Sequence, residues 1–236
     1  MKPLRHLLPL FLLLFIPLFI TPRSAAQLVH AVGTPVVPQT AFSSSRRLHE
    51  YHFAITAGPG LVTYSGDVDR VGLFPNGDHY WKPCVHLAFQ TLVFTPAEWL
   101  DVVAITESEY GSFQGKSDVY DFRTRAFQVS AGIKFEFFPR FPLRLYASGS
   151  GGVLLFSPTV TIKSPETEAL YPRFRGTAKS ALAIPITIGI LWTLGESYDF
   201  YYRFTKTIST TDNLDGWVSQ DRDNYQSFSI GIILYL

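Results

Sequence analysis

Apolar and polar residues alternate over long stretches of this chain. The segment 126–138, AFQVSAGIKFEFF, has an apolar side chain at almost every second position, and after the turn PRFP the alternation resumes at Leu143 and runs to Leu155. A period of two is typical of a strand whose two faces meet different environments. Proline cannot continue a β-ladder, so the turn predicts a hairpin. Its strands exceed the roughly 9–11 residues with which a β-strand crosses a bilayer.

The same alternation recurs along the chain and predicts eight strands. They are expected at about 50–64, 83–94, 99–110, 126–138, 143–155, 181–194, 198–208 and 227–236. The second, fourth and sixth strands are followed by three or four residues, and the first, third, fifth and seventh by roughly ten to twenty. Short periplasmic turns and long outer loops are typical of outer-membrane barrels. The predicted fold is all-β: an eight-stranded antiparallel up-and-down transmembrane β-barrel.

Charged residues indicate which face of the wall is turned inward. Lys134, Glu136, Arg144 and Arg203 lie on the face opposite the long apolar rows. Facing lipid, each charge would cost about 2–4 kcal/mol at the bilayer midplane. We therefore expect these four residues to form a charge network in the lumen. A barrel of eight strands is just wide enough to be filled by its own side chains, so a pore for solutes is not expected.

The alternation by itself also allows a soluble, lipocalin-like barrel with its apolar face inward and a ligand inside. The length of the strands, the asymmetry of the connections and a last strand that ends with the chain favour the membrane barrel. The predicted location is the bacterial outer membrane, with a monomeric barrel surrounded by lipid.

The N-terminus has the three parts of an export signal. Lys2 and Arg5 give a positive start, Leu7–Ile20 an apolar core, and small residues up to Ala26 a cleavage site. A retained membrane anchor is the alternative, but the apolar run is shorter than the roughly 20 residues that a spanning helix needs. The expected organisation is a signal peptide at 1–26, a flexible periplasmic leader at 27–49 and the barrel domain at 50–236.

Composition adds little evidence for a chemical function. The net charge is +1, which gives no indication of nucleic-acid binding, and a single cysteine, Cys84, excludes an internal disulfide. We expect no catalytic residue, cofactor or metal. Two weaker alternatives stay open. Four aspartates between 212 and 223 could bind calcium, and His79 or His86 could join a serine in a lipid-modifying barrel enzyme.

Three short motifs resemble those of a known family. Residues 64–67 are YSGD, residues 183–189 are AIPITIG, and a strand containing Arg203 leads to TDNLD at 211–215. In order and spacing these resemble the PorG-like outer-membrane barrels of the type IX secretion system, and the resemblance covers most of residues 50–236. The positions that carry it are Tyr64, Gly66, Asp67, Pro185, Gly189, Arg203, Thr211, Asp212, Leu214 and Asp215.

The resemblance implies a non-enzymatic role in protein transport. It suggests an outer-membrane barrel that anchors or supports a periplasmic secretion complex, with periplasmic secretion-ring proteins as partners. The alternative is a surface-exposed adhesion or structural barrel of the same membrane.

Overall fold

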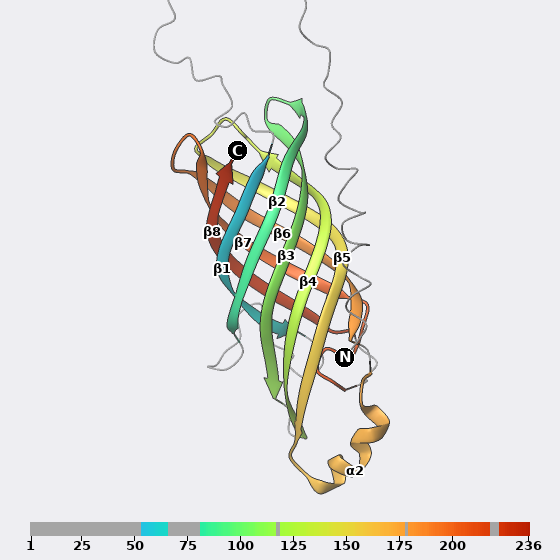
Figure 1. Ribbon diagram of the computed structural model, residues 1–236. Coiled ribbons are helices and arrows are strands. Elements are labelled where there is room, and N and C mark those ends of the chain that lie inside the picture. The colour runs from blue at the N-terminus through green and yellow to red at the C-terminus, as the bar shows by residue number, and fades with distance from the viewer. Residues whose placement is uncertain (1–52, 66–80, 117–118, 178, 218–221) are drawn as a thin grey trace, which may run out of the picture. The chain divides into compact units, whose positions relative to one another are not determined.

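Eight antiparallel strands form a closed barrel in the computed structural model (Figure 1). The structure describes residues 53–65, 81–116, 119–177, 179–217 and 222–236. Each strand pairs with the next along the chain, and β1 pairs with β8 to close the ring. The predicted fold class is therefore confirmed. The strands are β1 (Ala54–Ser65), β2 (Lys82–Ala97), β3 (Leu100–Lys116), β4 (Tyr120–Phe137), β5 (Leu143–Ile162), β6 (Ser180–Thr193), β7 (Tyr198–Ser209) and β8 (Asn224–Tyr235).

The strands β3, β4 and β5 extend farthest beyond the ranges that the alternation predicted. β3, β4 and β5 have 17, 18 and 20 residues, and they continue past the long-loop end of the other strands (Figure 1). The added segments are still amphipathic, but with their polarity reversed. In β4, Phe127 and Val129 point outward. Nearer the start of the strand, at its long-loop end, Arg123 and Arg125 point outward and Phe122 is buried inside. A prediction that follows apolar residues on one face of the strand therefore ends the strand too early, because the apolar residues change to the other face.

This reversal marks the outer boundary of the membrane. On β5 the outward row is apolar up to Leu155 and then becomes Ser157 and Thr159, while Phe156 is buried inside. Phe127 of β4 pairs with Leu155, and Arg125 pairs with Ser157, so the change occurs at the same level on both strands. Below this level lipid contacts the apolar face. Above it water is outside, so the barrel is apolar inside, as a soluble protein is.

Pro59 lies inside β1, where a proline is expected to cause a β-bulge, but no bulge forms there. Around Pro59 the ladder between β1 and β8 is broken, yet Ala57↔Ile232 and Gly60↔Ser229 on either side keep one register. The pairing with β2 continues through Pro59. The missing N–H therefore costs hydrogen bonding but inserts no extra residue. The register shifts of the barrel wall lie instead in β2, between Leu92 and Ala97.

Glycine allows β4 and β5 to curl tightly around the lumen. A Cβ on Gly152 would lie 2.0 Å from the carbonyl oxygen of Val129, and one on Gly132 would lie 2.2 Å from that of Gly149. Both glycines face inward, and each is paired with a serine of the neighbouring strand. Only a residue without a side chain permits this close approach.

One helix lies in the segment predicted as the third long loop. After β5 ends at Ile162, α2 (Pro165–Phe174) begins, with Glu166 and Glu168 in its first turn and Arg173 in its last. These charges are arranged favourably for the helix dipole. Within the described residues no helix is long and apolar enough to cross a bilayer.

Candidate functional site

The barrel is apolar outside and polar inside. Outward side chains such as Leu143, Leu182 and Ile188 are 62%, 62% and 59% exposed, whereas Glu136 and Arg144 in the lumen are 1% and 2% exposed. A soluble barrel has the opposite arrangement, because exposed apolar rows of this extent would not be stable in water. The lipocalin-like alternative is therefore wrong, and the wall is built to contact lipid.

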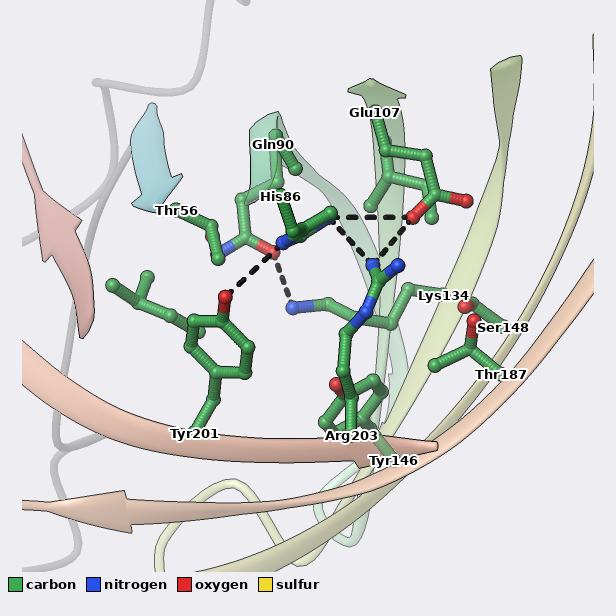
Figure 2. A pocket seen from close by; sticks show the side chains of 13 residues that line it. Thr56, His86, Gln90, Glu107, Lys134, Tyr146, Ser148, Thr187, Tyr201 and Arg203 are labelled. Atoms are coloured by element: carbon green, nitrogen blue, oxygen red, sulfur yellow. Dashed lines mark hydrogen bonds and ion pairs between the residues drawn. The ribbon is translucent and has the colours of Figure 1, made fainter. Parts of the chain in front are cut away.

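Arg203 on β7 is the centre of the first group of charges in the lumen. Its guanidinium donates from Nη1 to Glu107 Oε2 and from Nη2 to Glu109 Oε2, each over 2.9 Å. Nη1 also lies 2.5 Å from His86 Nε2, and the other ring nitrogen of His86 is 3.2 Å from the Tyr201 hydroxyl. Figure 2 shows His86 and Glu107 converging on the Arg203 guanidinium from β2 and β3. The group joins three strands across the interior.

A second group of charges lies nearer the short turns. Lys134 Nζ is 2.6 Å from Glu136 Oε1, and Arg144 Nη1 donates to Glu136 Oε2 over 3.2 Å. Arg144 also forms an ion pair with Asp199, whose carboxylate accepts a hydrogen bond of 2.5 Å from the Tyr235 hydroxyl. Two cations and two carboxylates thus lie together, which offsets the cost of burying each charge.

The four sequence-predicted network residues all lie in the lumen, but in different groups. Lys134, Glu136 and Arg144 are in the second group, whereas Arg203 is in the first. The acidic partners Glu107 and Glu109 were not included in the expected network, although they fall on the polar face of the third predicted strand. That strand has the least regular alternation, so its polar face was the weakest signal in the sequence.

Little free volume remains between the two groups. A hollow of about 30 Å³ is lined by His86, Gln90, Lys134, Tyr146 and Arg203 among others (Figure 2). This volume holds about one or two water molecules, since a site for a single water needs roughly 10–15 Å³ on this measure. Side chains of the described residues thus fill most of the middle of the barrel.

A buried segment of the β7–β8 connection closes the outer end of the lumen. Leu214 is fully buried, and its N–H donates to Asp223 Oδ2 over 2.7 Å. Its carbonyl accepts a hydrogen bond from the Thr124 hydroxyl of β4, and the Tyr64 hydroxyl of β1 donates to Asp223. We call residues 211–217 the outer plug. The plug is bonded to β4 directly and to β1 through Asp223, and these two strands are separated in the ring by β2 and β3.

The rest of the outer plug is fixed by an aspartate and two aromatic rings. Asp215 accepts a hydrogen bond of 2.5 Å from the Tyr120 hydroxyl and one of 2.8 Å from the Trp217 backbone N–H. The rings of Tyr120 and Trp217 stack at 5.0 Å. Gly216 between them has a φ of 84°, a left-handed conformation that favours glycine. The plug is thus a folded part of the barrel.

The family-like motif residues separate into three places. Tyr64, Leu214 and Asp215 are parts of the outer plug or its contacts, and the backbone carbonyl of Thr211 at its start accepts from Asp223 N–H over 3.0 Å. Asp212 is half-buried beside them. The second place is the wall, which contains Pro185 and Gly189 in β6, and the third is the Arg203 group already described. Gly66 and Asp67 lie outside the described residues.

Two β6 motif residues have local structural roles. β5–β6 pairing runs through Gly149↔Ile186 and resumes at Gly152↔Ala183, and it is missing beside Pro185, which has no N–H to donate. A Cβ on Gly189 would lie 2.4 Å from the Tyr146 ring. Gly189 therefore makes room for that ring in the lumen.

The two alternative chemistries find no support in the described residues. The two ring nitrogens of His86 face Tyr201 and Arg203 and not a serine hydroxyl, and His79 lies outside the described residues. Asp215 and Asp223 are engaged by tyrosine hydroxyls and backbone N–H groups, and Asp221 is not described. No group of three or more metal-ligating side chains occurs in the part of the chain that the structure covers.

No protein-family model and no curated protein matches the chain. Solved structures similar to it include Neisserial surface protein A, with 10% identity and a TM-score of 0.47 over 78% of this chain and 97% of that one. Ail, the attachment invasion locus protein of Yersinia pestis, in complex with sucrose octasulfate, has 13% identity and a TM-score of 0.42 over 79% and 99%. The outer membrane protein OprG from Pseudomonas aeruginosa has 12% identity and a TM-score of 0.43 over 79% of this chain and 96% of that one. Likenesses at this level say nothing about activity or partners.

The location follows from the wall itself. Its eight strands carry a lipid-facing apolar band, the described part of its lumen is polar and filled, and the β2–β3, β4–β5 and β6–β7 connections are short turns. A closed barrel leaves no strand edge unpaired in lipid, which is the condition for spanning a membrane with strands. This protein is an outer-membrane β-barrel.

Proposed function

We propose that this protein is a non-enzymatic, non-conducting barrel that anchors a periplasmic complex of the type IX secretion system at the outer membrane. The filled lumen carries the proposal. Two groups of ion pairs and the outer plug occupy much of the described interior. A barrel without a path through it can act only through its ends and its lipid-facing wall.

The periplasmic end has a surface that suits a protein partner. A hollow of about 300 Å³ lies between the β2–β3 and β4–β5 turns, lined by Thr95–Glu98, Pro139 and Arg140. Arg140 Nη1 donates to Glu98 Oε2 over 3.0 Å at its rim, where both charges are accessible. The two turns project together, because Leu100 of β3 pairs with Phe137 at the end of β4. A shaped, charged hollow of this kind is suited to a peptide segment.

The motif resemblance supports secretion as the context. Tyr64, Leu214 and Asp215, which are far apart in the sequence, meet in one hydrogen-bonded plug. Motifs that belong to one structural unit are expected to occur together in related barrels, which supports the likeness to the PorG-like proteins. The predicted leader, residues 27–49, would supply a further periplasmic contact, since an extended chain covers up to about 3.3–3.6 Å per residue.

The test is affinity purification of the detergent-solubilised protein from its own cells. Periplasmic ring components should be recovered, and the double variant Glu98→Arg/Arg140→Glu, which reverses both charges of the hollow, should reduce that recovery. Deletion of residues 28–48 should reduce it further. The matched control is Arg173→Glu on α2, a charge reversal at the opposite end. If no ring component is recovered, and a deletion of the gene leaves type IX secretion intact, the proposal is wrong.

A surface-exposed adhesion or structural role is the second candidate. It is favoured by the long β3–β5 extension and by α2, which give the outer end a folded structure of its own (Figure 1). Replacing α2 by a short glycine–serine linker separates the two. Loss of attachment of whole cells to a surface, with secretion unchanged, would favour this candidate over the anchor.

A further inference from the structure

The outward face of the β3–β5 extension carries a basic surface directly above the apolar band. Arg123 and Arg125 are exposed on β4 and point to the same side as Phe127, the last apolar residue of that row. Residues two apart on one face of a strand are separated by about 6.5–7 Å, so the two guanidinium groups are neighbours. We call Arg123, Arg125 and the residues paired with them the arginine patch.

The level of the patch is fixed by the cross-strand pairing. Phe127 pairs with Tyr110 of β3 and with Leu155 of β5, and all three are exposed on the outside. One level farther out, Arg125 lies between Ser112 and Ser157. The patch therefore begins where the hydrocarbon-facing surface ends, which is the depth of the lipid head groups.

The arginines have no acidic partner within the described residues. The neighbouring Asp121 is paired with Lys163, with Nζ and Oδ1 2.8 Å apart, so its charge is already compensated. In the part of the chain that the structure describes, no hydrogen bond or ion pair engages the side chains of Arg123 or Arg125. Around them, the flanking positions Ser112, Ser157 and Thr159 provide hydroxyl groups and no negative charge.

We propose that the arginine patch binds the phosphate groups of phosphorylated glycolipids in the outer leaflet. The patch is continuous with the lipid-contacting wall, so the molecule that covers the apolar band also presents its head group here. Guanidinium groups bind phosphate through paired, charge-assisted hydrogen bonds. The flanking hydroxyls can donate further hydrogen bonds to phosphate or sugar oxygens.

Phosphate binding at the arginine patch does not depend on the anchoring role. The patch lies at the outer end, whereas the proposed protein contacts lie at the periplasmic turns. A test with purified protein and lipid therefore gives the same result whether or not a periplasmic partner exists.

The experiment measures binding of bisphosphorylated lipid A to the folded full-length protein in detergent, by native mass spectrometry. The native protein should bind it, and should bind lipid A without phosphates at least about tenfold more weakly. The double variant Arg123→Gln/Arg125→Gln should lose affinity for the bisphosphorylated form by a similar factor. Arg123→Lys/Arg125→Lys, which keeps the charges but not the planar fork, should lie between the two.

The chain offers a matched control. Arg173 and Arg175 are also two exposed arginines one residue apart at the outer end, but they lie on and after α2 and not on the wall. Arg173→Gln/Arg175→Gln should leave lipid binding unchanged. Faster migration of unheated than of heated protein on a gel confirms that each variant is folded. Equal affinity of the native protein and the Arg123/Arg125 double variant, or equal loss in the control, would overturn the proposal.

Discussion

Individual residues in the lumen are under strong constraint, because charges buried there cannot be compensated by water. Arg203 is 4% exposed and holds two carboxylates that are also buried. Breaking a buried ion pair by removing one partner costs about 3–5 kcal/mol, whereas removing all partners together can be nearly neutral. The constraint therefore lies on the group of residues and not on each member separately.

The first prediction concerns the Arg203 group. Arg203→Met should lower the free energy of unfolding by about 3–5 kcal/mol, because Glu107 and Glu109 lose their shared cation. Urea unfolding in lipid vesicles, followed by tryptophan fluorescence, measures this change. The triple variant Arg203→Met/Glu107→Gln/Glu109→Gln is the control and should be less destabilised. A triple variant as unstable as the single one would contradict the role of uncompensated charge.

The second prediction compares two glycines. A Cβ on Gly189 would lie 2.4 Å from the Tyr146 ring and 2.5 Å from the Tyr202 carbonyl oxygen, whereas one on Gly149 would meet nothing within 4 Å. Gly189→Ala should therefore cost about 1–3 kcal/mol through overpacking. Gly149→Ala, on the outward face, should be neutral or slightly stabilising. The same unfolding assay decides; equal effects at both positions would show that crowding is not the cause.

At the scale of the elements, the strands β3, β4 and β5 each have two segments that differ in which face carries the apolar side chains. Within the membrane level the outward side chains of β4 and β5 are apolar or glycine, whereas β3 also carries Thr106 and Ser108 there. Beyond it the outward side chains of all three strands are mostly polar and the inner ones mostly apolar. The depth of a residue along its strand therefore decides which substitutions it accepts. This property can be tested at two outward positions of neighbouring strands.

The third prediction places an arginine at two depths. Ile188 lies near the middle of the outward row of β6, and Leu143 lies at the periplasmic start of β5, where it pairs with Trp192. Ile188→Arg should cost about 2–4 kcal/mol, and Leu143→Arg only about 0–1 kcal/mol, because a charge near the interface reaches water. The fraction of protein that folds into vesicles, measured by gel mobility, should follow the same order. Equal costs at both sites would contradict the assigned membrane level.

At the scale of the whole molecule, side chains occupy most of the described interior of the barrel. The two groups of ion pairs and the outer plug fill the interior, and the hollow between the groups holds only about one or two waters. A barrel of eight strands has room for little more than its own side chains. The functional surfaces are consequently its two ends and its lipid-facing wall.

The fourth prediction follows from this filled interior. The purified protein should require detergent, should migrate faster unheated than heated on a gel, and should produce no stable conductance steps in planar bilayers. The gel shift in the same preparation shows that the barrel is folded, so an absence of current cannot be ascribed to denatured protein. Reproducible unit conductance from folded protein would show that the lumen opens.

The sequence by itself determined the number of strands, their order and the direction of their faces. A period of two is a local property, because successive side chains of a strand point to opposite sides whatever the strand pairs with. The cost of a charge in lipid then placed Lys134, Glu136, Arg144 and Arg203 inside. The export signal and the leader remain predictions, since residues 1–52 lie outside the described part of the chain.

Only the tertiary structure decided which buried charges meet, where the membrane level ends and what closes the lumen. Partners across a barrel depend on register and on strand tilt, so the pairing of Arg203 with Glu107 and Glu109 has no signature within one strand. The Tyr64 hydroxyl is hydrogen-bonded to Asp223, 159 positions later, which in turn accepts from the N–H of Leu214 in the outer plug. The reversal of polarity at Phe127 and Leu155 becomes interpretable only when the two strands are seen side by side, because the same alternation continues through it with its phase exchanged.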